Sequence, residues 1–142
     1  MIKQAVMDDS KAVAELAILL WPDNETDDLE REMKEYINKG AIFICFDENR
    51  AVGFAQCNLR SDYVEGTESS PVGYLEGIFV RIEYRKRGIA KKLLNQCEYW
   101  AKGQGCSEFA SDCELNNTDS LKFHLQLGFE ETNRIICFKK KL

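Results

Sequence analysis

A strand that runs into a basic turn and then into a helix is the feature of this sequence that most constrains the fold. Residues 74–82 are rich in aromatic and aliphatic side chains and predict a strand. The turn Arg85-Lys86-Arg87 follows, and Gly88 opens a helical pattern that continues to about Lys102. Because the first amides of a helix lack internal partners and carry partial positive charge, this turn predicts a pyrophosphate site. Gly88 would let the phosphates approach the backbone, and the three cations would add charge.

The same turn has a plainer interpretation, a solvated basic loop before an ordinary glycine start of a helix. The segment is neither a Walker loop, which needs GxxxxGK followed by Ser or Thr, nor a GxGxxG dinucleotide turn. Composition alone therefore leaves both interpretations open.

The order of the remaining elements predicts the fold class. Helices are expected over about 8–21 and 26–39, with Thr26 as the cap of the second. An antiparallel hairpin over 41–46 and 51–59 follows. The strand over 74–82 and the helix from Gly88 to about Lys102 come next. They are followed by a short strand over 108–112, a helix over about 118–127 and a last strand over 134–140. Since parallel neighbours need a crossover, this order predicts a mixed α/β sheet with helices on its faces. At 142 residues the chain is expected to form one domain, 1–142.

Charge and cysteine content exclude several classes of partner. A net charge of −5 argues against nucleic acid, because phosphate binding needs Lys and Arg clustered on one face, and a cationic partner fits better. The six cysteines include no CxxC pair and there is one histidine, so we expect neither a metal site nor disulfides. Neither a signal peptide pattern nor a long apolar run is present, so we expect a cytosolic protein that does not enter a membrane.

The basic turn also carries a family resemblance. Residues Arg85-Lys86-Arg87-Gly88-Ile89-Ala90 fit every fixed position of the acetyl-CoA motif of the GNAT acetyltransferase superfamily, an Arg or Gln, two free positions, Gly, one free position, then Gly or Ala. The segment with Asn117, Ser120 and Phe123, followed by Leu127-Gly128-Phe129, is similar to the second element of that family. The resemblance implies a central, mostly antiparallel mixed sheet with two splayed strands, flanked by helices.

The resemblance further implies where acetyl-CoA would bind. The backbone of Ile78, Phe79 and Val80 would bond the pantetheine arm and the acetyl group. The turn residues Arg85, Lys86, Arg87, Gly88, Ile89 and Ala90 would hold the pyrophosphate. Asn117 and Ser120 would approach the far side of the coenzyme.

Variable segments of the chain most resemble the aminoglycoside 6′-N-acetyltransferases. They are Leu20-Trp21-Pro22, Ser61-Asp62-Tyr63-Val64-Glu65-Gly66, Ser69-Ser70-Pro71, Leu75-Glu76-Gly77-Ile78-Phe79-Val80, Ala110-Ser111-Asp112 and Leu127-Gly128-Phe129-Glu130-Glu131-Thr132. The resemblance implies that Trp21, Tyr63, Glu76 and Asp112 form the sugar pocket, and that the protein is a homodimer built around its C-terminal region. Independently, an antibiotic with several ammonium groups and sugar rings needs carboxylates and aromatic side chains in its pocket.

Acetyl transfer needs a neutral amine, and Glu76 is the candidate that would accept the proton, because it interrupts an otherwise apolar strand. Alternation places Glu76 on the same face as Tyr74 and Ile78; alternatively it sits at a wet strand end or pairs with a cation. Asp112 is expected to bind an ammonium group and could also transfer a proton. The amide of Val80 or Phe79 would stabilise the oxyanion.

The group that protonates the departing thiolate is left open. Many GNAT enzymes place a tyrosine four residues before the glycine of the GF turn, and this chain has His124 there. His124 could donate the proton, or it could be structural while the thiolate leaves unaided.

Three alternatives to an aminoglycoside acetyltransferase remain at this point. The chain could acetylate another amine, such as a polyamine or a peptide N-terminus. It could bind coenzyme A without catalysis. It could instead be an interaction module whose partner binds the acidic segment 23–35. If the chain is an enzyme, this segment is either a surface that attracts a polycation or a solvated helix face.

Overall fold

The computed structural model describes residues 1–142 and contains four α-helices and five strands. The strands are β1 (Ile2–Gln4), β2 (Ala41–Asp47), β3 (Arg50–Arg60), β4 (Val72–Val80) and β5 (Phe109–Ala110). The helices are α1 (Ser10–Leu20), α2 (Thr26–Lys39), α3 (Ile89–Gly103) and α4 (Thr118–Gln126). Two short 3-10 turns cover Met7–Asp9 and Ile82–Tyr84.

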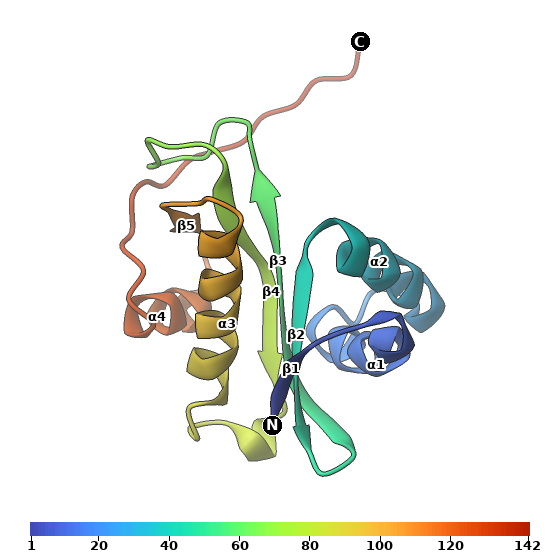
Figure 1. The fold of residues 1–142 in the computed structure, drawn as a ribbon. Coiled ribbons are helices and arrows are strands. Elements are labelled where there is room, and N and C mark those ends of the chain that lie inside the picture. The colour runs from blue at the N-terminus through green and yellow to red at the C-terminus, as the bar shows by residue number, and fades with distance from the viewer.

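One sheet with the strand order β1-β2-β3-β4-β5 forms the centre of the structure. The first four strands pair antiparallel and β5 pairs parallel with β4. The parallel pair is joined by the crossover helix α3, as parallel neighbours require. Figure 1 shows α3 on one face of the sheet and α1 and α2 on the other. The predicted mixed α/β fold is therefore confirmed.

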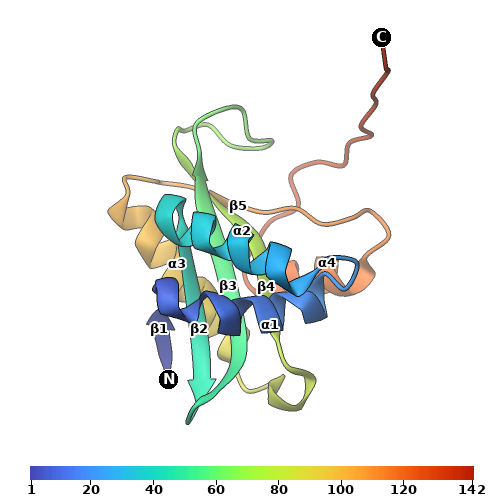
Figure 2. The ribbon, with the colours of Figure 1, turned by 90° about the vertical axis from the view of Figure 1, so that its right-hand side faces the viewer.

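Strand alternation divides the apolar residues into two cores. On one face Leu93 and Cys97 of α3 pack with Ala55 and Leu75 of the sheet. On the other face α1 and α2, which lie side by side in Figure 2, pack against a separate set that includes Phe54. Because both faces are covered, the interior of β2 and β3 is buried almost without interruption.

The second helix begins differently from the prediction, which placed Thr26 at the N-cap. Glu25 occupies the N-cap with extended backbone angles, and Thr26 is the first helical residue. The carbonyl of Glu25 accepts the first intrahelical bond from the amide of Leu29 at 3.0 Å. The predicted cap was thus wrong by one residue, and no side chain caps this helix.

The predicted last strand over 134–140 is wrong. No strand follows α4, and the tail leads away from the sheet in Figure 1. Its apolar side chains are exposed, Ile136 by 78% and Phe138 by 90%. A strand needs a neighbour for its backbone hydrogen bonds, and this tail lies beside none in the single chain.

Other features of the chain bear on its partners. No helix has both the length and the apolar character needed to cross a bilayer. No group of three or more His, Cys, Asp or Glu side chains is arranged to hold a metal ion. All six cysteines are free thiols, of which Cys113 and Cys137 are exposed.

Candidate active site

The site begins where β4 and β5 separate. Their pairing covers only Gly73 with Phe109 and Tyr74 with Ala110. On its other side β4 remains paired with β3 as far as Val80. Residues Leu75–Val80 therefore have one edge without a neighbouring strand, which we call the open edge of β4.

Main-chain donors at the open edge follow from strand alternation. The amide of Arg81 donates to the carbonyl of Val52 at 2.8 Å and so points toward β3. Because successive amides of a strand point to opposite sides, those of Val80 and Ile78 point to the open edge. The amide of Phe79 points toward β3. Of the two amides expected to stabilise the oxyanion, only that of Val80 therefore points to the open edge.

Glu76 lies in a β-bulge. Gln56 of β3 pairs with Gly77 and Cys57 pairs with Leu75, so Glu76 between them has no partner. A bulge adds one residue to a strand and resets its alternation. The prediction that Glu76 shares a face with Ile78 is therefore wrong, because Ile78 packs against the core beneath α3. The sequence pattern could not reveal this inserted residue.

The glycine after Glu76 admits the ring of Trp21. A Cβ at Gly77 would lie 2.6 Å from a carbon of that ring, which fixes Gly77 on the α1 face of the sheet. The ring also meets Phe54 edge-on, with centroids 6.2 Å apart. Trp21 is thus held directly beside the bulge.

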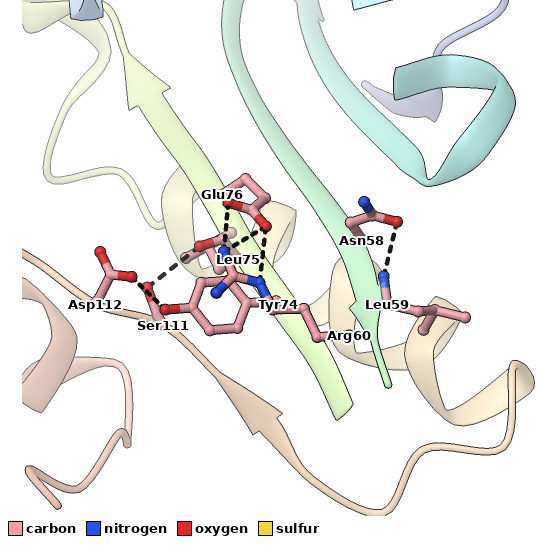
Figure 3. Close-up of polar contacts among 8 residues, drawn as sticks. All are labelled: Asn58, Leu59, Arg60, Tyr74, Leu75, Glu76, Ser111 and Asp112. Carbon is pink, nitrogen blue, oxygen red and sulfur yellow. Dashed lines mark hydrogen bonds and ion pairs between the residues drawn. The ribbon is translucent and has the colours of Figure 1, made fainter. Parts of the chain in front are cut away.

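Four side chains at the bulge form a connected set, the polar cluster, consisting of Arg60, Tyr74, Glu76 and Asp112 (Figure 3). The guanidinium of Arg60 donates to Glu76 Oε1 at 3.0 Å and to Oε2 at 3.2 Å. The same group lies 3.4 Å from the ring centroid of Tyr74. The Tyr74 hydroxyl in turn donates to Asp112. Glu76 therefore pairs with a cation, which was one of the expected alternatives.

The cluster perturbs its own titrating groups. Burial raises the pKa of Tyr74 well above its ordinary value, and the bond to Asp112 raises it further. Burial alone would lower the pKa of Arg60, but its hydrogen bond to Glu76 raises that pKa above its ordinary value. Burial and the charge of Glu76 raise the pKa of Tyr36, which reaches this neighbourhood from α2.

Sequence reasoning missed Arg60, Tyr74 and Tyr36 as members of the site. Arg60 directly precedes the segment Ser61-Asp62-Tyr63 that carried the subfamily resemblance, and Tyr74 lies two residues before Glu76. This closeness in sequence to predicted site residues was the only indication that Arg60 and Tyr74 belong to the site. It does not indicate that Arg60 and Tyr74 would stack.

Tyr63 is not brought to the polar cluster. Its side chain is 80% exposed on the loop between β3 and β4, and its hydroxyl donates to Glu65. Asn133 of the C-terminal tail also donates to Glu65, at 2.8 Å. The loop that carries Tyr63 therefore contacts the tail.

His124 is linked to the open edge through Ser111. The Nδ1 atom lies 2.7 Å from the carbonyl oxygen of Ser120, and Nε2 lies 2.8 Å from Ser111 Oγ. A carbonyl can only accept, so these partners assign the proton to Nδ1 and leave Nε2 to accept from Ser111. Ser111 Oγ also lies 3.4 Å from the carbonyl oxygen of Leu75. Sequence reasoning did not single out Ser111 as a separate site residue.

The basic turn leads into a helix that no side chain caps. Gly88 is the N-cap of α3 with φ of +79°, a conformation that favours glycine. A Cβ there would meet nothing within 4 Å. The first amides of α3 thus lack both internal and side-chain partners.

Two of the three predicted cations of the turn already have local partners. Arg85 Nε donates to the carbonyl of Val80 at 2.8 Å, and Arg87 donates to the carbonyl of Glu83 at 3.0 Å. Lys86 is exposed. At the far side Asn117 caps α4 by accepting from the amide of Ser120 at 3.1 Å.

With this geometry the fold and site define an acetyltransferase. The chain belongs to the Acetyltransferase (GNAT) family, which it matches over residues 10–129. Among curated relatives it is 45% identical to an aminoglycoside N(6′)-acetyltransferase type 1 of Acinetobacter baumannii over 130 residues, covering 89% of this chain and 88% of the relative. It is 39% identical to the protein of that name from Acinetobacter haemolyticus, covering 99% and 98% of the two chains.

Solved structures agree with this assignment. The aminoglycoside N-acetyltransferase AAC(6′)-Iy in complex with CoA matches with a TM-score of 0.95 and 40% identity, covering 100% of this chain and 95% of that one. The same enzyme in complex with the bisubstrate analog CoA-S-monomethyl-acetylneamine matches with a TM-score of 0.94 and 40% identity, over 100% and 98% of the chains. The predicted family is confirmed.

Proposed function

We propose that this chain transfers an acetyl group from acetyl-CoA to the 6′-amine of an aminoglycoside antibiotic, by direct attack in a ternary complex, and so confers resistance. The observation that carries the proposal is the polar cluster, in which Glu76 and Asp112 lie beside the open edge of β4. Relatives 39% and 45% identical carry the corresponding name. A similar structure holds an analog that joins coenzyme A to an aminoglycoside.

The coenzyme would lie along the open edge of β4. The amides of Ile78 and Val80 are positioned to bond its pantetheine arm, and Val80 is the proposed oxyanion donor. The uncapped start of α3, with open space over Gly88, suits the pyrophosphate. Asn117 and Ser120 are proposed to approach the far side of the coenzyme.

The aminoglycoside would be bound by the polar cluster and Trp21. Asp112 offers a carboxylate to an ammonium group, and the ring of Trp21 offers a flat surface to a sugar. Glu76 is the proposed acceptor of the proton that the reacting amine must lose, either directly or through water. Tyr63, on the loop between β3 and β4, is proposed as a further substrate residue, and in this structure its hydroxyl bonds Glu65 and not the polar cluster.

The leaving thiolate would take its proton from the Ser111 hydroxyl, whose oxygen would in turn take the Nε2 proton of a doubly protonated His124. The hydroxyl of Ser111 bridges toward the carbonyl of Leu75 at the open edge, and His124 stands behind it. Departure of the thiolate without protein help is the alternative.

The protein is proposed to act as a homodimer in the cytoplasm, with residues 1–142 as one domain. The exposed apolar tail supports association, because Ile135, Ile136 and Phe138 find no cover in the single chain. The six free thiols suit the reducing conditions of the cytoplasm.

The direct test measures release of coenzyme A thiol with kanamycin or tobramycin as acceptor. We expect turnover well above acetyl-CoA hydrolysis. A polyamine and a peptide N-terminus at equal concentration test the alternative substrates, and faster turnover of either one would reject the aminoglycoside assignment. Calorimetric binding of acetyl-CoA without transfer to any amine would instead indicate a non-catalytic coenzyme-binding module.

A further inference from the structure

Arg60 is held in a fixed position although it lies at the end of a strand. Its Cα pairs with that of Val72, and its side chain runs along β4 to reach Glu76. Three hydrogen bonds of 3.0 to 3.3 Å join the guanidinium to the Glu76 carboxylate. The stacking on Tyr74 fixes the plane of the group. A positive charge is therefore part of a site that we propose to receive a cation.

The charged surroundings of Arg60 come from three elements. Glu76 and Tyr74 face it from β4, and Asp112 faces it from the segment after β5. Tyr36 faces the pair from α2, with Glu32 of that helix beyond it. The guanidinium offsets one of the two carboxylates in the polar cluster. The site is thus less negative beside Glu76 than its two carboxylates alone would make it.

This placement affects the amine that reacts. An aliphatic amine in water is protonated at neutral pH, and its ammonium form cannot attack the acetyl group. A like charge within about 4–6 Å disfavours the charged form of a titrating group. An amine bonded to a Glu76 oxygen would lie at about this distance from the guanidinium that holds both oxygens.

We propose that Arg60 is a positioning residue with an electrostatic effect: it fixes the Glu76 carboxylate and, by its own charge, favours the neutral form of the amine that reacts there. The proposal rests on the function proposed above. It assigns binding of the remaining ammonium groups of the acceptor to Asp112, which faces Arg60 but forms no ion pair with it.

The test is the pH profile of kcat, with both acetyl-CoA and the acceptor saturating, for Arg60→Gln and Arg60→Lys, because kcat reports the groups that titrate in the bound complex. Without the charge, the acid limb of the profile should move to higher pH by about one unit. Arg60→Lys keeps the charge and should leave the limb within about 0.3 unit of wild type, although loss of the two-point bond lowers kcat. Arg50→Gln is the matched control, because Arg50 pairs with Glu83 at 3.0 Å and lies over the ring of Tyr84 away from the polar cluster.

Two acceptors whose 6′-amines differ in basicity separate the amine from Glu76. A limb that belongs to the amine moves with the acceptor, whereas a limb that belongs to the carboxyl group does not. Arg60→Gln should shift the limb that follows the acceptor. If Arg60→Gln does not fold, Arg60→Met replaces it, because methionine is uncharged at every pH and adds no titrating group to the profile.

A parallel loss of kcat at every pH in Arg60→Gln, with no shift of the acid limb, would overturn the proposal and leave Arg60 a structural residue. A shift confined to the limb that ignores the acceptor would also overturn it. These results differ from failure of the proposed function, in which the wild-type chain itself acetylates no aminoglycoside.

Discussion

The ring of Trp21 occupies the space that a side chain on Gly77 would need. A Cβ at that position would come within 2.6 Å of one ring carbon and 2.9 Å of another. The contact joins the end of α1 to the strand that carries Glu76. The aromatic residue and the bulge of the proposed acceptor site are therefore fixed by one another.

Gly77→Ala should destabilise the protein by about 1–3 kcal/mol, because the added methyl group forces the ring of Trp21 to move. The free energy of unfolding in urea measures this loss. Gly103→Ala is the control, since a Cβ there meets nothing within 4 Å. A loss in Gly77→Ala no larger than in the control would contradict the contact.

Tyr74→Phe should lower stability at neutral pH by about 1–2 kcal/mol, because Asp112 loses its hydroxyl partner. The variant should also change the alkaline behaviour. The folded state raises the pKa of Tyr74, so its contribution is complete below the ordinary tyrosine pKa of about 10 and declines as pH rises above it. Urea unfolding at pH 8 and pH 11 should show a smaller difference from wild type at pH 11. An equal difference at both values would show that the pKa is not raised.

Glu76→Gln should lower kcat by about 100-fold or more at neutral pH, as expected for loss of a group that accepts a proton. The deficit should shrink at high pH, where more of the amine is already neutral. Glu83→Gln is a suitable control, because Glu83 also pairs with an arginine but lies outside the polar cluster. A deficit that stays constant from pH 6 to 9 would argue for a purely positioning role.

The chain should sediment as a dimer at micromolar concentration. Replacing Ile136 and Phe138 by Glu should shift it toward monomer, because these side chains are 78% and 90% exposed in the single chain and need cover. Lys141→Glu tests whether added negative charge alone has this effect. Wild-type protein that sediments only as monomer would disprove the proposed dimer.

Local patterns predicted most of the fold. The apolar spacing of α1, α2 and α3 and the polar turn between β2 and β3 depend on neighbouring residues, so the sequence contains the necessary information. The strand expected over 134–140 failed because pattern indicates a preference for extended backbone, whereas a strand also requires a partner. The cap of α2 moved to Glu25 because its carbonyl and backbone angles, and not its side chain, begin the helix.

Only part of the candidate site could be predicted, because some of its contacts depend on how the strands pair. Glu76 could be chosen because a carboxylate is unusual in an apolar strand, and Asp112 because its segment resembles the aminoglycoside 6′-N-acetyltransferases. Arg60 could not be, because its contacts depend on the register between β3 and β4 and on the residue inserted at Glu76. That register results from packing on both faces of the sheet, which no short segment of sequence specifies.

The donors along the open edge of β4 belong to the peptide backbone, and every amino acid except proline supplies them. Side chains at Ile78 and Val80 can therefore change without removing a single N–H group. Exchange of either residue for proline would delete one donor of the open edge and leave the other donors of β4 in place. Substitutions other than proline at these two positions can thus change the neighbouring core, while the backbone N–H groups that would bond an extended ligand remain.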